Sequence, residues 1–342
     1  MKTVQSRRSV LGGLGLAPLA AAQYARRQLL GAAGAGVVLA GQAGAAQKPM
    51  RGIFPIIVTP YTAKKEIDYE DLAAEAGFLE RCGVHGMVWP QIASEYTKLT
   101  RDERMRGMEV IAKAASGRRP ALVFGVQAPD TLAAVEYARR AEALGADAII
   151  AIPPGEAQSL DDFGRYYRSL ARATARPLFV QTSGGAPGVV PSVEFLVGLA
   201  REFPQAAYVK EEFNPVVDRM IALAKQRPII KGIFSGNHGL NLLYEMRLGM
   251  DGTCPASPVA DAYTAIWNRY HAGEIETARD IFSKLLLIIN LEQQIPGTYL
   301  YLLKKRKVFK TTVSRLRESQ LTAAAVEEIE FAFSALKPYL SA

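Results

Sequence analysis

Short apolar runs alternate along residues 51–272 with stretches in which apolar residues recur every three or four positions. Runs of the first kind are typical of strands that are covered on both faces, whereas the second spacing predicts amphipathic helices. The pattern occurs eight times, with one helical stretch after each apolar run. It predicts strands over 53–59, 86–90, 120–126, 147–152, 177–181, 207–210, 229–235 and 252–256.

Helix-start and helix-stop signals lie between these runs. Asp68 is placed as an N-cap, and Thr100 with Glu103 has the spacing of a capping box. Gly83 and Gly145 follow apolar stripes, where a glycine commonly ends a helix. Helices are therefore predicted to start near residues 68, 100, 131, 159, 191, 215, 240 and 260.

Eight strand–helix units within residues 51–272 favour a closed (β/α)8 TIM barrel in the α/β class. An open doubly wound sheet is the alternative, but no GxGxxG sequence follows the first predicted strand. Three more helices are predicted within 274–339, with apolar stripes around Ile281, Tyr299 and Ile329. We therefore expect the barrel over 51–272 and a three-helix C-terminal extension over 273–342, which serves as an appendage or an oligomer contact.

Residues 1–46 have the pattern of a targeting segment rather than of a folded domain. Arg7 and Arg8 stand in a twin-arginine-like sequence, and a second arginine pair precedes an apolar stretch over 29–40 and small residues over 43–45. This pattern predicts a cleaved signal peptide of the twin-arginine type and a periplasmic protein. The alternative is an uncleaved membrane anchor, but the apolar stretch is shorter than the about 20 residues that cross a bilayer. No stable membrane insertion is expected after cleavage.

Composition and charge exclude several classes of protein. The chain has 342 residues, of which 49% are hydrophobic and 22% are charged, as is typical of globular proteins. Of its 41 Lys and Arg residues, five lie within 1–46, a segment without Asp or Glu. The rest of the chain therefore has 36 basic and 33 acidic residues, so its charges nearly balance. No basic stripe with interleaved aromatic residues remains, and nucleic acid is not an expected partner.

The few cysteines and histidines predict neither a metal site nor a cofactor. Cys82 and Cys254 have no metal-ligand spacing, and both are expected to be free buried thiols. The three histidines, His85, His238 and His271, are scattered along the chain and form no zinc or iron pattern.

Lys210 is the main candidate for chemistry. Active sites of (β/α)8 barrels lie at the C-terminal ends of the strands, and Lys210 closes the apolar run that begins at residue 207. A lysine that points into the barrel loses hydration, which favours the neutral amine that attacks a ketone and forms a Schiff base. The alternative is a structural lysine paired with Glu211 or Glu212. Glu212 shares the strand face of Lys210 by alternation, and it is our candidate acid or base.

Three segments and the C-terminal helices resemble those of a known family. The segments are Val58-Thr59-Pro60-Tyr61, the stretch 86–100 that ends Glu95-Tyr96-Thr97-Lys98-Leu99-Thr100, and Tyr208-Val209-Lys210-Glu211. Together they resemble the dihydrodipicolinate synthase / N-acetylneuraminate lyase family over essentially all of 51–340. The resemblance implies a class I lyase that forms a Schiff base with a 2-oxo acid and is commonly a homotetramer. It also implies that Lys210 is the nucleophile and that Glu95 is a structural anchor of the site loop.

The chain departs from this family at the residues that move protons. The family sequence Gly-Thr-Thr-Gly-Glu falls on residues 91–95, where only Glu95 is kept and where Ile92 and Ala93 have no hydroxyl group. In the family those threonines help to hold the substrate carboxylate, and one relays protons. The family's tyrosine after strand four is missing, because Pro154 and Gly155 follow Pro153 here. The arginine that binds the second substrate of the synthases falls near Ala186, so synthesis of dihydrodipicolinate is not expected.

Other residues at the strand ends are candidates to replace what is missing. Glu212 and His238 are candidates for proton transfer, and Tyr61 or Tyr96 for a phenol. Residues 183–185 form a candidate anion nest. The residues that we expect to bind substrate are Thr59, Gln91, Ser94, Gln181 and Ser235.

Three functions follow from these observations. The first is an exported Schiff-base lyase, either an aldolase or a dehydratase, that acts on a small, sugar-derived 2-oxo acid without a cofactor and forms a tetramer or a dimer. The second is a barrel that has lost this chemistry and acts as a periplasmic binding or structural protein. The third is a metal-assisted enzyme that uses the ligands Glu95, Glu211, Glu212 and His238, although their spacing matches no motif.

Overall fold

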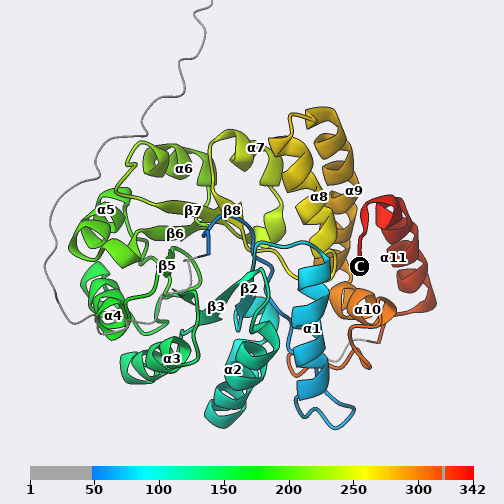
Figure 1. Cartoon of the computed structure of the whole chain (residues 1–342), viewed down its shortest axis with the longest axis horizontal. Coiled ribbons are helices and arrows are strands. Elements are labelled where there is room, and N and C mark those ends of the chain that lie inside the picture. The colour runs from blue at the N-terminus through cyan, green and yellow to red at the C-terminus, as the bar shows by residue number, and fades with distance from the viewer. Residues whose placement is uncertain (1–47, 318–319) are drawn as a thin grey trace, which may run out of the picture. The chain divides into compact units, whose positions relative to one another are not determined.

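The computed structural model describes residues 48–317 and 320–342. The predicted signal peptide, residues 1–46, lies outside the described residues. In Figure 1 the strands form a ring that helices surround. The strands are β1 (Gly52–Ile53), β2 (Gly86–Trp89), β3 (Ala121–Gly125), β4 (Ala148–Ala151), β5 (Leu178–Gln181), β6 (Tyr208–Glu211), β7 (Gly232–Ser235) and β8 (Gly252–Thr253).

All paired strands are parallel, and each lies beside its neighbours in the chain. The order in the sheet is β1-β8-β7-β6-β5-β4-β3-β2. The remaining edge is closed just beyond β1, where Ile56 forms parallel bridges with both Val88 and Ala256. The predicted (β/α)8 TIM barrel is therefore confirmed, and the open sheet is wrong.

Eight helices of the described residues alternate with the strands. They are α1 (Tyr69–Arg81), α2 (Arg101–Ala115), α3 (Thr131–Ala143), α4 (Leu160–Ala173), α5 (Val193–Glu202), α6 (Val216–Ala224), α7 (Leu242–Arg247) and α8 (Ala260–His271). Asp68 caps α1 by accepting hydrogen bonds from the backbone N–H groups of Glu70 and Asp71. The capping box of Thr100 and Glu103 forms at the start of α2.

Two helix starts differ from the prediction. The helix expected from residue 191 begins at Val193, because the side chain of Ser192 accepts a hydrogen bond from the N–H of Phe195 and caps it. The helix expected from residue 240 begins at Leu242, because a 3₁₀ turn over Asn237–Gly239 comes first. This turn brings backbone and side chains of the β7 loop to the mouth of the barrel.

The alternation along each strand divides the core into two layers. Inside the barrel, Phe234 packs edge to face against both Phe54 and Phe179, with ring centroids 5.1 Å and 4.9 Å apart. On β6, Val209 points outward into the layer between strands and helices, whereas Tyr208 packs against the interior cluster. Lys210 comes one residue later and therefore returns to the interior.

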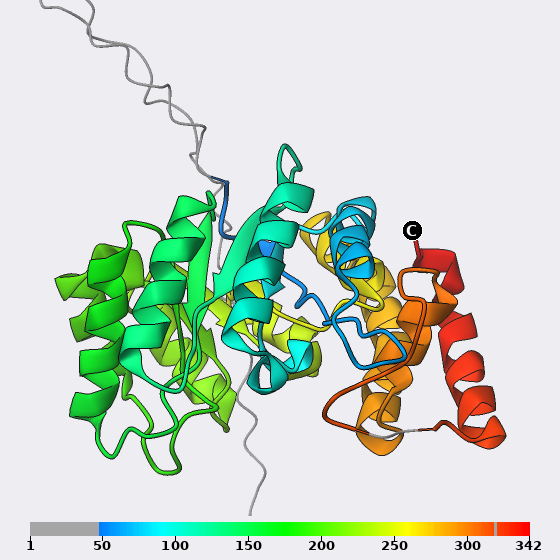
Figure 2. The same ribbon diagram turned by 90° about the horizontal axis from the view of Figure 1, so that it is seen from below.

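The C-terminal extension consists of α9 (Ile275–Gln294), α10 (Thr298–Lys305) and α11 (Ala323–Leu336). Figure 2 shows these gold-to-red helices beside the barrel, next to α8. A buried ion pair attaches them, with Arg306 Nη2 at 2.6 Å from Asp261 Oδ2 of α8. The chain after α10 then returns to the barrel, where the Thr311 hydroxyl donates to the carbonyl oxygen of Tyr61.

None of the helices in residues 48–317 and 320–342 is both long and apolar enough to cross a membrane.

Candidate active site

Lys210 lies inside the barrel at the C-terminal end of β6, and its side chain is only 3% exposed. Its Nζ donates a hydrogen bond to Gln181 Oε1 at 3.2 Å. The same nitrogen lies 3.3 Å from Glu212 Oε1. The amine is therefore held by one neutral amide and one carboxylate, and Gln181 orients it from the neighbouring strand β5.

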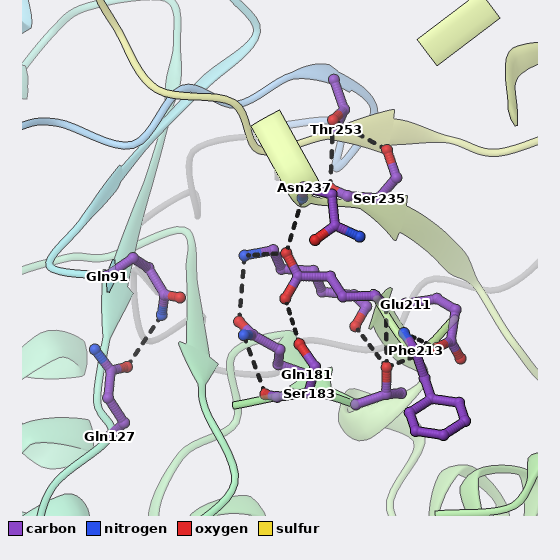
Figure 3. A network of polar contacts seen from close by, with 12 residues as sticks. Gln91, Gln127, Gln181, Ser183, Glu211, Phe213, Ser235, Asn237 and Thr253 are labelled. Atoms are coloured by element: carbon purple, nitrogen blue, oxygen red, sulfur yellow. Dashed lines mark hydrogen bonds and ion pairs between the residues drawn. The ribbon is translucent and has the colours of Figure 1, made fainter. Parts of the chain in front are cut away.

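Glu212 is a buried carboxylate with several donors. Besides Lys210, the Ser183 hydroxyl donates to its Oε2 at 2.7 Å, and the N–H of Asn237 donates to its Oε1 at 3.2 Å (Figure 3). Burial acts to raise the pKa of Glu212, but the charge of Lys210 and these hydrogen bonds prevail and lower it. Glu212 is thus ionised at neutral pH. An added Cβ at residue 236 would lie 1.5 Å from Glu212 Oε1, so a side chain there would displace the carboxylate.

Glu211 points to the other side of the strand. Its Oε2 lies 2.9 Å from Arg219 Nε, and its Oε1 accepts from the Thr182 hydroxyl at 2.7 Å. Lys210 therefore pairs with Glu212 and not with Glu211. The strand alternation that predicts this face for Glu212 holds in the structure.

His238 faces the same region from the turn after β7. Its Nδ1 lies 3.3 Å from the hydroxyl of Tyr299, which comes from α10. Burial lowers the pKa of His238; Glu212 opposes this shift, while Lys210 and Arg317 add to it. Burial also raises the pKa of Tyr299, so the phenol keeps its proton.

Glu95 connects the β2 loop to the C-terminal extension. Its φ of 56° lies in the left-handed region. One carboxylate oxygen accepts from the Ser314 hydroxyl at 2.5 Å, and the other accepts from the N–H groups of Arg315 at 2.9 Å and Leu316 at 3.2 Å. Glu95 thus holds residues 314–316 against the mouth of the barrel.

These groups enclose a cavity of about 320 Å³. One part of its wall is polar and comes from Ser183, Lys210, Glu212, Asn237, His238 and Tyr299. The part on the side of β1 and β2 is mainly apolar and includes Ile56, Val58, Ile92 and Ala93. Arg317 adds a cation from the extension, where its Nη1 lies 3.3 Å from Glu292 Oε1.

Two of the predicted substrate-binding residues instead hold the β1 and β2 loops together. The Thr59 hydroxyl donates to the carbonyl oxygen of Ser94 at 2.6 Å and accepts from Trp89 Nε1 at 3.1 Å. The Ser94 hydroxyl donates to the carbonyl oxygen of Ile57 at 2.5 Å and accepts from the N–H of Gln91 at 3.0 Å. Thr59 and Ser94 are not among the described residues that line the cavity, and their role in substrate binding stays a prediction.

Gln91, Gln181 and Ser235 are also absent from the cavity wall formed by the described residues. Gln91 Nε2 donates to Gln127 Oε1 at 3.0 Å, and Figure 3 shows this pair apart from the network around Gln181. The Ser235 hydroxyl donates to Thr253 Oγ1 at 3.0 Å, between β7 and β8. Of the five predicted binding residues, Gln181 alone bonds to the lysine amine.

The candidate phenols Tyr61 and Tyr96 do not line the cavity either. The guanidinium group of Arg315 lies over the Tyr61 ring, 4.6 Å from its centroid, and this contact fixes the returning C-terminal segment. Among the described residues, the tyrosine that lines the cavity is Tyr299, which the sequence pattern marks only as part of an apolar helix stripe. No local signal marks it, because its neighbour His238 is 61 residues away.

The four ligands of the metal-assisted alternative do not come together. Glu211 points outward to Arg219, and Glu95 is bonded to the C-terminal segment. Among the residues described in the structure, no group of three or more His, Cys, Asp or Glu side chains is placed to hold a metal ion. Cys82 and Cys254 are both buried and free, as predicted.

Residues 49–317 match the Dihydrodipicolinate synthetase family, and the chain belongs to this family. It is 28% identical to the "Probable 2-dehydro-3-deoxy-D-pentonate aldolase" of Escherichia coli K12 over 74% of this chain and 82% of that protein. It is 27% identical to the L-2-keto-3-deoxyarabonate dehydratase of Azospirillum brasilense over 72% of this chain and 81% of that protein. An aldolase and a dehydratase of this kind are both lyases with small-molecule substrates.

The fold has close counterparts among solved structures. The dihydrodipicolinate synthase of Rhodopseudomonas palustris superposes with a TM-score of 0.76 over 84% of this chain and 97% of that chain, at 24% sequence identity. This likeness supports the barrel with its C-terminal helices.

Proposed function

We propose that this chain is a Schiff-base-forming lyase that acts on a 2-oxo acid. The observation that carries the proposal is the position of Lys210, a buried amine at a cavity of about 320 Å³ with Gln181 and Glu212 as its partners. Membership of a lyase family supports the same chemistry. A structural lysine would need no cavity beside its nitrogen.

In the proposed reaction, the neutral amine of Lys210 adds to the C2 carbonyl of the substrate. The nitrogen gives up one proton, the oxygen takes that proton and a second one from solvent and leaves as water, and an iminium ion remains. The Glu212 carboxylate, 3.3 Å from Lys210 Nζ, balances the charge of the iminium. The iminium then accepts the electron pair of a breaking bond at C3, which serves cleavage of a C–C bond or loss of water.

We further propose a sugar-derived substrate. Two relatives are named for 3-deoxy sugar acids, one as an aldolase and one as a dehydratase. In the cavity, Asn237 and Arg317 provide polar side chains for hydroxyl groups beyond C3, whereas Ile92 and Ala93 provide none. The hydroxyl groups of the substrate would therefore lie on the side of the cavity formed by Asn237 and Arg317, and not on the side of Ile92 and Ala93.

Reductive trapping tests the proposal. The signal-free protein is incubated with borohydride and pyruvate or 2-oxo-3-deoxy sugar acids, and the adduct is located by peptide mapping. We expect one adduct on Lys210, none in Lys210→Ala, and an unchanged adduct in Lys231→Ala. Lys231 is a matched control because it is exposed and its Nζ donates to the carbonyl oxygen of Pro204, away from the cavity. Absence of an adduct with every acid, in protein shown to be folded, would overturn the proposal in favour of a binding protein.

We also propose export through the twin-arginine route and assembly into a homotetramer or a homodimer. The pattern of residues 1–46 supports export, and membership of the family supports assembly. The export route is tested by expression in a bacterium, where the intact mass of the periplasmic protein is measured. Two double variants are compared with the unaltered chain: Arg7→Lys/Arg8→Lys and Arg26→Lys/Arg27→Lys. Light scattering of the purified protein tests assembly, and a monomer would contradict it.

A further inference from the structure

The proposed lyase needs a base, and Glu212 is poorly suited to be one. Its two oxygens already accept hydrogen bonds from Lys210, Ser183 and Asn237, and its pKa is lowered. A carboxylate that is stabilised in its charged form takes up a proton weakly. Glu212 therefore suits the role of a fixed counter-charge, and the proton must go to another group.

His238 is held in an unusual backbone conformation at the cavity. Its φ of 57° is left-handed, as is the φ of 48° at Asn237 before it. The Tyr263 hydroxyl donates to the carbonyl oxygen of His238, and a Cβ at Gly239 would come within 2.8 Å of the Tyr263 ring. Non-glycine residues persist in this region only when their surroundings fix them, and such residues concentrate at functional sites.

The ring of His238 is oriented through one of its two nitrogens. Nδ1 is paired with the Tyr299 hydroxyl at 3.3 Å, and the two ring centroids lie 5.7 Å apart. The N–H of Tyr299 in turn donates to Glu292 Oε2 at 2.8 Å, which fixes the start of α10. Within the part of the chain that the structure describes, Nε2 has no hydrogen-bond partner, and His238 lines the cavity.

His238 is linked to Lys210 through two intervening residues, Glu212 and Asn237. Glu212 Oε1 is bonded both to Lys210 Nζ, at 3.3 Å, and to the N–H of Asn237, at 3.2 Å. Asn237 directly precedes His238. Burial and the charge of Lys210 also lower the pKa of His238, so the ring is neutral and able to accept a proton at neutral pH.

We propose that His238 Nε2 is the base that removes a C3 proton from the iminium formed on Lys210, and that Tyr299 is a positioning residue for its ring. This inference rests on the proposed Schiff-base function. The Tyr299 oxygen accepts Nδ1–H in the tautomer that leaves Nε2 without a proton. Neither residue occupies a position that the family resemblance marks for proton transfer.

The step conserves atoms and charge. A proton passes from C3 to Nε2, the electron pair of the C3–H bond forms a C2=C3 double bond, and the π pair of C2=N becomes a lone pair on nitrogen. The iminium is then a neutral enamine, and His238 is an imidazolium whose Nδ1–H remains on Tyr299. Reversal returns a proton to C3. In D₂O the returning particle is a deuteron, because the imidazolium exchanges with solvent.

This reversal gives a test that does not need the natural substrate. The protein is incubated with pyruvate in D₂O, and loss of the C3 proton signal is followed by NMR, while borohydride trapping is measured in parallel. We expect His238→Asn to reduce exchange at least about 100-fold with trapping retained, and added imidazole to restore part of the rate. Asparagine is chosen because it tolerates a left-handed backbone. His271→Gln, outside the cavity, is the control and is expected to exchange normally.

Tyr299→Phe is a second variant that removes only the hydroxyl. We expect exchange to fall about five- to tenfold at saturating pyruvate, with the pyruvate concentration for half-maximal rate unchanged, because the ring is less well oriented but the cavity keeps its shape. Normal exchange in His238→Asn with intact trapping would overturn the inference, and loss of exchange in Glu212→Gln alone would assign the base to Glu212 instead. Absence of trapping in the unaltered protein would be a failure of the proposed function, not of this step.

Discussion

The cavity wall near β5–β7 and the wall near β1–β2 differ in what their side chains bond to. Near β5–β7, the wall residue Ser183 bonds to Glu212 and Glu212 bonds to Lys210, whose nitrogen also donates to Gln181, so the polar groups are fixed around one nitrogen. Near β1–β2 the wall is mainly apolar, and its charged residue Glu95 faces the C-terminal segment. The polar side chains of the wall are thus concentrated near β5–β7, whereas the wall near β1–β2 is mainly apolar and attaches the C-terminal segment.

Among the variants of the two walls, removal of the Lys210 amine should have the largest effect on turnover. Lys210→Ala is expected to lower turnover by about 10⁴-fold or more, because the proposed covalent intermediate loses its nucleophile. It should also raise the pKa of Glu212, which loses the charge that lowers it. Steady-state kinetics and infrared titration of the carboxylate measure the two effects. Turnover within tenfold of normal would assign the chemistry to another residue.

Glu212→Gln should change how the free energy of unfolding depends on pH, because it removes a charged group from the β5–β7 side. Because the pKa of Glu212 is lower in the folded state than its ordinary value of 4.5, ionised Glu212 stabilises the fold. This stabilisation is complete at pH values above 4.5, and it is lost as the pH falls below 4.5 toward the lowered pKa. The free energy of unfolding of the variant should therefore differ from that of the unaltered chain more at pH 7 than at pH 3.

Chemical denaturation at both pH values measures this difference. Glu276→Gln is the matched control, since Glu276 pairs with Arg279 on the surface and its side chain is 76% exposed. A difference in unfolding free energy between Glu212→Gln and the unaltered chain that does not change with pH would contradict the assignment of an ionised carboxylate.

Glu95→Gln should loosen the attachment side without touching the lysine. An amide nitrogen at one oxygen position removes an acceptor for the N–H groups of Arg315 or Leu316, which should cost about 2 kcal/mol of local stability. We expect faster amide hydrogen exchange over residues 314–316, a several-fold higher KM and retained trapping on Lys210. Unchanged exchange at these amides would show that Arg315 holds the segment through Glu103 instead.

Ile92→Thr should have the smallest effect. Ile92 is 57% exposed at the rim of the apolar wall, so a hydroxyl there has little influence on the lysine. We expect exchange of pyruvate within about threefold of normal and a small gain for hydroxylated substrates, since a single exposed hydrogen bond contributes about 1 kcal/mol. Leu132→Thr, at an 84% exposed position outside the cavity wall, controls for surface polarity. A large loss of trapping would show that the apolar wall shapes the Schiff-base step.

Local signals were sufficient for the barrel and for the direction of Lys210. Caps such as Asp68 and the Thr100–Glu103 pair bond within a few residues, so their pattern in the sequence is also their pattern in space. Strand alternation likewise predicts that Lys210 and Glu212 share a face. Both inferences depend on neighbours that the chain itself brings together.

The rest of the site depends on contacts between distant segments. Three predicted binding residues lie at the ends of predicted strands: Thr59, Ser94 and Ser235. The hydroxyl group of each one donates a hydrogen bond to a neighbouring loop or strand. Tyr299 reads as one more apolar position of α10, and only the docking of that helix brings it to His238. Position at a strand end therefore predicts the neighbourhood of a site but not which side chains face its cavity.

The return of the extension to the barrel also has a consequence for protein synthesis. Strands β1–β8 are translated before Tyr299 and before residues 314–317. This last segment supplies part of the cavity wall, and its residues 314–316 bond to Glu95. Domains begin to fold while the ribosome is still working. A nascent chain with its barrel already emerged thus has the lysine but not the finished pocket. The cavity beside Lys210 is complete only once the late segments have been made, so a prematurely terminated chain lacks residues of its wall.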